Sequence, residues 1–148
     1  MRVAIASDHA GFELKENLKP FLKSDLGFDL IDLGTNSPDS VDYPDYAHAL
    51  AAKVEHNQAD FGVLICGSGN GVCITANKHK GVRAAMAWLP EIAALARQHN
   101  DANVICLPAR YISTGDAEAI LKAFFSATFE GGRHEKRVDK IASYEQKH

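Results

Sequence analysis

Phe61-Gly62-Val63-Leu64-Ile65-Cys66-Gly67-Ser68-Gly69-Asn70-Gly71 is the stretch that decides the fold of this chain. Its first five residues form an apolar run that predicts a buried strand, and its glycines predict a tight loop ahead of the helix-compatible residues 72–78. A strand that passes through such a loop into a helix brings several backbone N–H groups to one point, where the helix adds the positive end of its dipole. We therefore expect an anion-binding loop with a thiol beside it.

Cys66 is the candidate base of this site. A thiol near a helix N-terminus loses its proton more readily than a free thiol, and a base that touches an oxyanion hole suits the abstraction of a proton next to a carbonyl group. A cysteine taken alone is more often a small buried hydrophobic residue, so the assignment depends on the loop. Cys73 and Cys106 have no such loop, and we expect them in the core.

Strands and helices alternate along the chain. Apolar runs predict strands at residues 2–7, 28–33, 60–66, 82–87 and 103–107, and helical spacing predicts helices near residues 12–22, 46–54, 70–79, 90–98 and 114–129. Each strand is a nearly continuous run of Val, Ile and Leu, which indicates a parallel sheet covered by helices on both faces. We therefore predict a single α/β domain over residues 1–148 with a five-stranded parallel sheet.

The polar segment from Arg133 to the end has Val138 and Ile141 as its main apolar residues. A helix with so small an apolar face does not belong in the core. Two alternatives remain for it: a C-terminal helical arm that packs on a neighbouring subunit, which the charge spacing favours, and a frayed tail.

Composition and charge exclude several classes of function. The 148 residues carry a net charge of −3, without the basic excess of a nucleic-acid-binding protein, so we expect no nucleic acid partner. No apolar run approaches the roughly 20 residues of a membrane span and no leader precedes the first strand, which favours a cytoplasmic protein with no membrane contact. The three cysteines show no paired spacing and the seven histidines no HExxH motif, so neither a disulfide nor a metal is expected.

Polar residues follow most of the predicted strands. They are Asp8 and His9 after the first, Tyr43 beyond the second, residues 66–71 after the third and Arg110 after the fifth. Ligands of parallel sheets bind beyond the carboxyl ends of the strands, so we expect these residues to form one site. His99 and Asn100 instead end a helix at the opposite edge of the sheet, and we expect them to reach a site only in a second subunit.

A nucleotide site is the main alternative for the glycine loop. The spacing here is GxGxG, whereas a dinucleotide fold has GxGxxG after its first strand and an acidic residue at the end of the next strand. In this chain the next strand ends at Met86-Ala87-Trp88, and no Walker-type phosphate loop is present. A non-catalytic module that binds a nucleotide or phosphate therefore stays as a second, less favoured hypothesis.

Several separated motifs occur together in a fixed order. They are Ser7-Asp8-His9-Ala10-Gly11-Phe12, Asp42-Tyr43-Pro44, Ile65-Cys66-Gly67-Ser68-Gly69, Ala76-Asn77-Lys78, Arg97-Gln98-His99-Asn100-Asp101-Ala102-Asn103-Val104, and Glu130-Gly131-Gly132-Arg133-His134 with Arg137. Together they resemble the type B ribose-5-phosphate isomerases and the related allose- and galactose-6-phosphate isomerases. The resemblance implies a Rossmann-like three-layer α/β/α sandwich, a homodimer or dimer of dimers with sites shared between subunits, and no metal or organic cofactor. It also implies interconversion of ribose 5-phosphate and ribulose 5-phosphate through an enediolate, in the non-oxidative branch of the pentose phosphate pathway.

The same resemblance assigns roles to individual residues. Cys66 is implied as the base, His99 as the proton donor that assists opening of the sugar ring, and Ser68, where other members often have threonine, as a third catalytic group. The implied substrate contacts are Asp8, His9, Tyr43, Gly67, Ser68, Gly69, Asn70, Gly71, Asn100, Arg110, Arg133 and Arg137. One subgroup has a glutamate base directly after the loop, where this chain has Val72, so the thiol takes that role. The choice between a five-carbon and a six-carbon sugar phosphate stays open, and no role is assigned to His48, His56, His79, His134 or His148.

Overall fold

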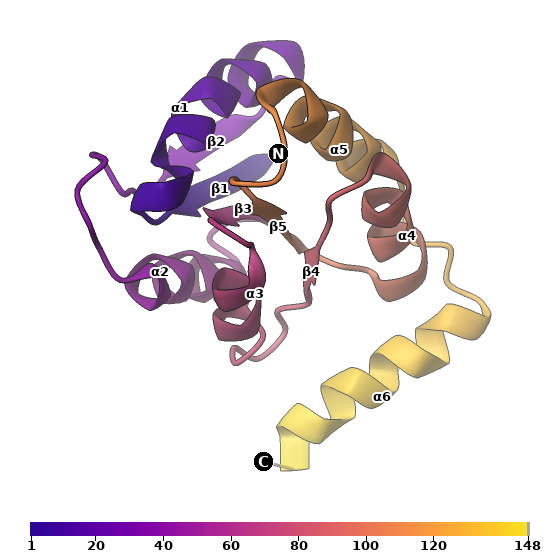
Figure 1. The fold of residues 1–148 in the computed structure, drawn as a ribbon. Coiled ribbons are helices and arrows are strands. Elements are labelled where there is room, and N and C mark those ends of the chain that lie inside the picture. Colours follow the sequence, from indigo (N-terminus) through magenta and orange to yellow (C-terminus); the bar gives the residue numbers. More distant parts are fainter. Residues whose placement is uncertain (148) are drawn as a thin grey trace.

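Five parallel strands form one sheet in the order β2-β1-β3-β5-β4 (Figure 1). The computed structural model describes residues 1–147, and its strands are β1 Arg2–Ser7, β2 Asp29–Asp32, β3 Phe61–Cys66, β4 Ala84–Met86 and β5 Val104–Pro108. The register pairs Ser7 with Ile65 and Cys66 with Pro108. The carboxyl ends of β1, β3 and β5 therefore meet at one edge of the sheet.

Helices cover both faces of this sheet. They are α1 Phe12–Pro20, α2 Tyr43–Glu55, α3 Asn70–Ala76, α4 Pro90–Asn100, α5 Thr114–Ser126 and α6 Arg133–Lys147, with a 3₁₀ turn η1 His9–Gly11 and a π turn η2 Phe21–Asp25. Neighbouring residues of a strand point to opposite faces. Val3 and Ile5 accordingly share a core with residues of α1, α4 and α5, whereas Ala4 and Ala6 share one with residues of α2 and α3. The predicted three-layer α/β sandwich is confirmed.

None of these helices, as far as residue 147, has both the length and the apolar character needed to cross a membrane.

β4 is shorter than the strand predicted at residues 82–87, and side chains accept or donate several of the backbone hydrogen bonds at its start. The Arg83 amide donates to Asn103 Oδ1 at 2.8 Å. At Ala84, Asn77 Oδ1 accepts from the amide at 2.8 Å, and Asn77 Nδ2 donates to the carbonyl at 2.9 Å. The Asn77 side chain thus occupies the place that another strand would take at this edge of the sheet.

The sequence predicts that α5 reaches residue 129, but the helix ends at Ser126. Ala127 has an extended backbone, with φ −88° and ψ 154°. The Glu130 amide then donates to the carbonyl of Gln98 at 3.0 Å. The chain leaves the helix early because this segment runs beside the end of α4, a contact between distant residues that local helical spacing does not encode.

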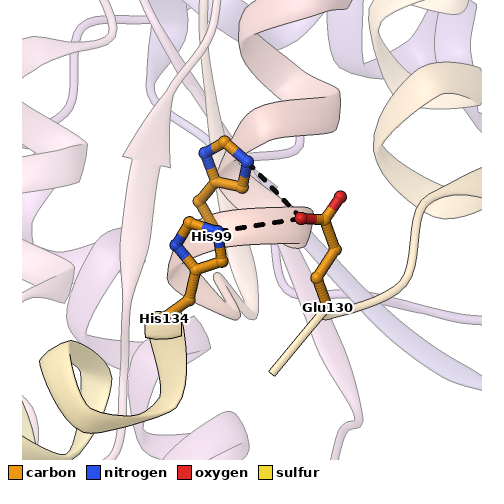
Figure 2. A group of neighbouring side chains, drawn as sticks. All are labelled: His99, Glu130 and His134. Carbon is orange, nitrogen blue, oxygen red and sulfur yellow. Dashed lines mark ion pairs between the residues drawn. The ribbon is translucent and has the colours of Figure 1, made fainter. Parts of the chain in front are cut away.

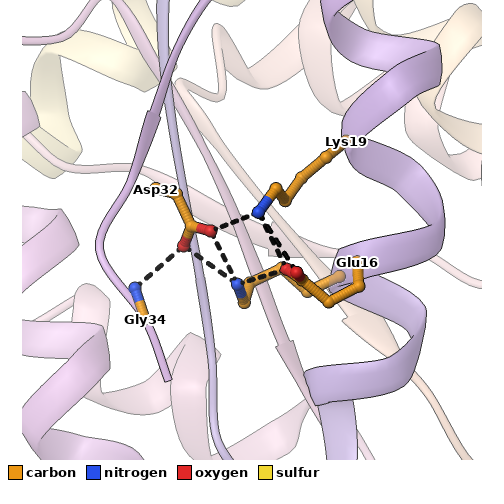
Figure 3. A network of polar contacts seen from close by, with 5 residues as sticks. Glu16, Lys19, Asp32 and Gly34 are labelled. Atoms are coloured by element: carbon orange, nitrogen blue, oxygen red, sulfur yellow. Dashed lines mark hydrogen bonds and ion pairs between the residues drawn. The ribbon is translucent and has the colours of Figure 1, made fainter. Parts of the chain in front are cut away.

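A buried lysine joins α1 to β2. Lys15 has no exposed surface, and its Nζ donates to both oxygens of Asp32 and to Glu16 Oε2, each at 2.9 Å. Lys19 Nζ reaches the same Asp32 carboxylate at 2.9 Å, and the Gly34 amide donates to Asp32 Oδ1 at 2.9 Å (Figure 3). Burial raises the pKa of Asp32, but these hydrogen bonds outweigh it and lower the pKa from 3.8 to about 2. The charged carboxylate fixes the turn that follows β2.

α6 lies outside the sandwich (Figure 1). Of its residues up to 147, His134 and Val138 are buried, and Ile141 and Tyr144 are more than half exposed. The helix contacts α4, and the Gly81 amide donates to both oxygens of the Glu145 carboxylate, at 3.1 and 3.0 Å. The predicted helix is present, and the packing of α6 on a neighbouring subunit stays a prediction. His148 lies outside the described residues.

Candidate active site

The candidate site lies where the path of the chain through the sheet reverses. β1 continues to β2 on one side, whereas β3 continues to β4 on the other, which opens a crevice at the carboxyl ends of β1 and β3. A cavity of about 390 Å³ occupies this position. It is lined by Asp8, His9, Ala10, Tyr43, Cys66, Gly67, Ser68, Gly71, Arg110 and Tyr111. All but Ala10 and Tyr111 are site residues that the sequence predicts.

Glycines bring the loop after β3 close to two side chains. Gly69 starts α3 with φ +78°, a conformation that other residues rarely adopt. A Cβ on Gly71 would lie 2.4 Å from the Tyr43 ring, and a Cβ on Gly67 would lie 2.9 Å from the Arg110 guanidinium. Because positions 67 and 71 carry no side chain, Tyr43 and Arg110 pack directly on the loop backbone.

Cys66 is the last residue of β3 and forms part of the cavity wall. It is 5% exposed, and it also belongs to the core that packs against α2 and α3. Its carbonyl accepts from the Ala109 amide at 2.9 Å, which fixes the end of the strand, and its thiol is free. A free thiol in the wall of a small polar cavity is placed to exchange a proton with a bound molecule.

Backbone amides already orient three polar side chains of the cavity. Asp8 Oδ1 accepts from the Gly11 amide at 3.1 Å and caps η1. His9 Nδ1 accepts from the Val41 amide at 3.2 Å, which places the proton of the neutral ring on Nε2. Ser68 Oγ accepts from the amide two residues later in the loop at 3.3 Å. These contacts leave Asp8 Oδ2, His9 Nε2–H and the Ser68 hydroxyl hydrogen to meet a ligand.

The cavity lining does not include Gly69 and Asn70 of the same loop, and Asn70 lines a larger neighbouring cavity. Four further predicted site residues lie elsewhere in the chain. His99 and Asn100 end α4 just before β5, whereas Arg110 follows the other end of β5, and a strand of this length spans about 16 Å. Asn100 lines a separate cavity of about 400 Å³. Arg133 and Arg137 line another, of about 530 Å³, on α6. One copy of the chain thus presents the predicted site as separated parts.

Around His99 the structure gathers two further side chains that sequence analysis left without a role. His99 Nε2 and His134 Nε2 each lie 3.7 Å from Glu130 Oε1, and the two imidazole rings are stacked (Figure 2). Within residues 1–147 this is the group whose donor types and spacing match those of a metal site. Glu130 and His134 belong to a motif that the sequence shows, but their contact with His99 arises only in the fold.

A larger cavity, of about 750 Å³, adjoins the first and shares Ser68 and Tyr111 with it. Its walls are mainly apolar and include the half-exposed Trp88 and Leu89. The larger volume favours ligand binding, whereas proton transfer needs titratable groups in contact with the ligand. The titratable residues in this wall are Tyr111, which the two cavities share, and Asp116, whose Oδ2 accepts from the Ser113 amide at the start of α5. The smaller cavity, which holds the thiol and an arginine, is therefore the better candidate for chemistry.

Cys106 is buried in the core and Cys73 packs against the same core, as the sequence predicts. Burial raises the pKa of the Cys106 thiol, and a hydrogen bond with Cys106 lowers the pKa of the Cys73 thiol. Neither residue lines the cavity of Cys66.

Comparisons with known proteins match nearly the whole chain. A family model described as Ribose/Galactose Isomerase matches residues 3–141. The probable ribose-5-phosphate isomerase B of Mycoplasma genitalium is 49% identical over 97% of this chain and 95% of that protein. The ribose-5-phosphate isomerase B of Escherichia coli is 42% identical over 99% of this chain and 97% of that protein.

Solved structures agree with these matches. The ribose-5-phosphate isomerase B of Mycoplasma genitalium with bound ribulose 5-phosphate has a TM-score of 0.95 and 48% identity, and the match covers 99% of this chain and 97% of that chain. The ribose-5-phosphate isomerase B of Clostridium thermocellum has a TM-score of 0.96 and 42% identity, and the match covers 99% of both chains. The resemblance to type B ribose-5-phosphate isomerases is confirmed. Because sequence and fold agree over almost its full length, this chain belongs to the ribose/galactose isomerase family.

Proposed function

We propose that this chain is an aldose–ketose isomerase that interconverts ribose 5-phosphate and ribulose 5-phosphate. The observation that carries the proposal is the free thiol of Cys66 in the wall of a small polar cavity, beside the glycine loop. The names of the relatives support it, since they are ribose-5-phosphate isomerases B and one was solved with ribulose 5-phosphate.

The reaction moves a proton between C1 and C2 of the sugar through an enediolate. It needs one base, and several hydrogen-bond donors for the oxygen that becomes negative. In our proposal Cys66 takes the C2 proton as a thiolate and returns it to C1 as a thiol, while a hydroxyl proton passes from the C2 oxygen to the C1 oxygen. The amides of residues 67–71 and the Ser68 hydroxyl donate to the sugar oxygens. One well-placed donor lowers the barrier by roughly 3 to 4 kcal/mol. Two or more such donors in the loop therefore contribute to the rate at least as strongly as the base.

Other residues of the cavity bind the rest of the substrate in this scheme. Asp8 accepts from a sugar hydroxyl, His9 donates through Nε2–H, and the Tyr43 hydroxyl lies at the same wall. Arg110 binds the phosphate, because the planar fork of a guanidinium matches the phosphate oxygens. The phosphate does not react, and its binding energy positions the carbon chain.

We place His99, Asn100, Arg133 and Arg137 in the same site through a second subunit of a homodimer, or of a dimer of dimers. The separation of these residues from Cys66 within one chain supports this, as does the position of α6 outside the sandwich. His99 gives a proton to the ring oxygen as the bond from C1 breaks, and the C1 hydroxyl loses its proton to water and becomes the aldehyde. The scheme uses no metal or organic cofactor.

Replacement of Cys66 tests the assigned base. A general base contributes about 10²- to 10⁴-fold to the rate, so Cys66→Ala should lower kcat by that factor and still bind ribose 5-phosphate in a calorimeter. Cys73→Ala is the matched control, because it removes a thiol outside the cavity, and it should keep nearly full activity. Near-normal turnover by Cys66→Ala would contradict the proposal. If the wild-type protein binds a nucleotide tightly and shows no isomerase activity, the non-catalytic nucleotide- or phosphate-binding module is favoured instead.

A mixing experiment tests the shared site. Cys66→Ala and His99→Ala proteins are each expected to be nearly inactive. After random subunit exchange about a quarter of the sites combine an intact Cys66 with an intact His99, so activity should return toward that fraction. If light scattering and tagged subunits prove the exchange and activity still stays absent, His99 serves the site of its own chain.

Six-carbon sugar phosphates are the second candidate substrates, because the matching family model names galactose beside ribose. Turnover of ribose 5-phosphate, allose 6-phosphate and galactose 6-phosphate, measured side by side, decides between them. We place the enzyme in the cytoplasm, in the non-oxidative branch of the pentose phosphate pathway. Its three free cysteines suit a reducing compartment.

A further inference from the structure

The group around His99 joins three separate parts of the chain (Figure 2). His99 comes from the last turn of α4, Glu130 from the segment after α5, and His134 from the first turn of α6. The two rings lie 4.1 Å apart between centroids with planes only 12° apart. The side chain of His99 is 35% exposed and that of His134 is 11% exposed, so a buried ring supports a more accessible one.

The stacking argues against a metal ion as the purpose of this group. A zinc ion binds a histidine nitrogen at about 2.0 to 2.1 Å, in the plane of the ring. Two nearly parallel rings 4.1 Å apart direct their nitrogen lone pairs side by side, and an ion between them lies in neither plane. The geometry suits the fixing of one ring in place.

Contacts on the face and on one edge of the His99 ring restrict its orientation. The face of the ring lies on His134, which fixes the tilt of its plane. The Nε2 edge faces the Glu130 carboxylate at 3.7 Å, while Nδ1 is turned away from that carboxylate (Figure 2). Such contacts are often long in the absence of substrate and shorten when it binds. The backbone of Glu130 is held beside the end of α4, because its amide donates to the carbonyl of Gln98 at 3.0 Å.

The surroundings of His134 disfavour its charged form. Burial lowers the pKa of His134, the neighbouring His99 and Arg133 lower it further, and Glu130 opposes these effects. His134 therefore suits the role of a flat support, while the Glu130 carboxylate lies 3.7 Å from Nε2 of the more exposed His99 ring and can orient that edge.

We propose that Glu130 and His134 are positioning residues for His99, which hold its imidazolium in the orientation needed to open the sugar ring. The inference rests on the proposed isomerase function, because only that function gives His99 a proton to deliver. Glu130 acts through Nε2 of His99, and His134 acts as a flat support. Neither residue touches the substrate in this scheme.

Variants at these two positions test the inference with ribose 5-phosphate that carries deuterium at C2. Loss of the partner that orients a metal-bound histidine typically costs about 10- to 100-fold. We expect a similar cost for an orienting partner here, so Glu130→Gln and His134→Ala should lower kcat by about that range. Ring opening breaks no bond to deuterium. The isotope effect on kcat should therefore fall below the wild-type value when ring opening becomes the slow step.

Two control variants separate positioning from folding. His134→Phe keeps a flat ring and should retain kcat within about threefold, because aromatic rings stack on histidine in the same way. Glu135→Gln neutralises a neighbouring exposed carboxylate that lies outside the group and should behave as the wild type. Thermal unfolding of every variant shows whether the fold is intact. Glu130→Gln is isosteric at a position whose side chain is 52% exposed, so it should fold.

The outcomes are distinct. Slower variants with a reduced isotope effect, together with rescue by His134→Phe, support the positioning role. A folded Glu130→Gln that keeps wild-type kcat overturns the inference, and so does a slower one whose isotope effect equals or exceeds that of the wild type. If the wild-type protein itself does not isomerise ribose 5-phosphate, the proposed function fails, which is a different result.

Discussion

A methyl group added at Gly71 is the most direct probe of how the loop packs against Tyr43. Its Cβ would lie 2.4 Å from Cε1, 2.5 Å from Cζ and 3.0 Å from Cδ1 of the Tyr43 ring. Carbon atoms in contact lie about 3.5 to 4.0 Å apart, so the ring has to move by more than about 1 Å. Tyr43 is 39% exposed at the start of α2, and its ring has room to swing outward. The loss of stability should therefore be near the low end of the roughly 1 to 3 kcal/mol that overpacking costs.

Activity should fall much more than stability. The displaced ring leaves the wall of the Cys66 cavity, and a shift of about 1 Å in a group that positions substrate costs about 100-fold in rate. We therefore expect Gly71→Ala to lower kcat/KM for ribose 5-phosphate about 100-fold. The melting temperature of the same variant, followed by circular dichroism, should fall by only about 2 to 4 °C.

The control for this prediction is Gly115→Ala in α5. There the added methyl group meets nothing closer than Ser113 Oγ at 3.8 Å, so neither activity nor stability should change much. In a Tyr43→Ala background the clash is absent, and Gly71→Ala should cost little more. The packing argument is refuted if Gly71→Ala keeps kcat/KM within about threefold of wild type, or if its cost is the same with and without the Tyr43 ring.

Two further predictions concern the polar contacts. The pKa of Asp32 is about 2 in the fold and 3.8 outside it, so the stabilisation is fully present above about pH 5 and is lost as the pH falls through 2. Urea titrations between about pH 5 and pH 2 should show that the free energy of unfolding falls by about 2 kcal/mol through this carboxylate, and Asp32→Asn should abolish that part of the fall. The assignment would be disproved if stability depended on pH in the same way in Asp32→Asn and the wild type. At the loop, a Cβ on Gly67 would lie 2.9 Å from Arg110 Nη1 and 3.2 Å from Cζ. Since the Arg110 side chain is flexible, Gly67→Ala should displace its guanidinium and raise KM about tenfold with little change in kcat. An unchanged KM would contradict the binding of the phosphate by Arg110.

The sequence predicts most of the fold because its signals are local. β3 and the loop after it are read from one apolar run followed by closely spaced glycines, and β1 and β5 from similar runs. The rule that ligands bind at the carboxyl ends of parallel strands then brings Asp8, His9 and Arg110 to Cys66, as the cavity has them. The same rule places His99 at the other end of β5, where the structure has it.

The rest depends on contacts between distant residues. The apolar run at 82–87 gives no sign that the side chains of Asn77 and Asn103 bind the backbone at the start of β4. Nor does helical spacing show that α5 stops at Ser126. Glu130 and His134 stand close together in the sequence, yet their meeting with His99 requires the segment after α5 to return beside α4. Patterns of hydrophobic residues carry no information about such encounters.

The amide of Asn77 also constrains assembly. Because it satisfies both backbone groups of Ala84, β4 cannot accept a strand from another molecule at that point. Two copies therefore cannot merge their sheets through this border, and any subunit contact there must be built from side chains. Recognition between subunits then depends on complementary shape and charge. The same side-chain amide also opposes uncontrolled strand-to-strand association of the kind seen in fibrils.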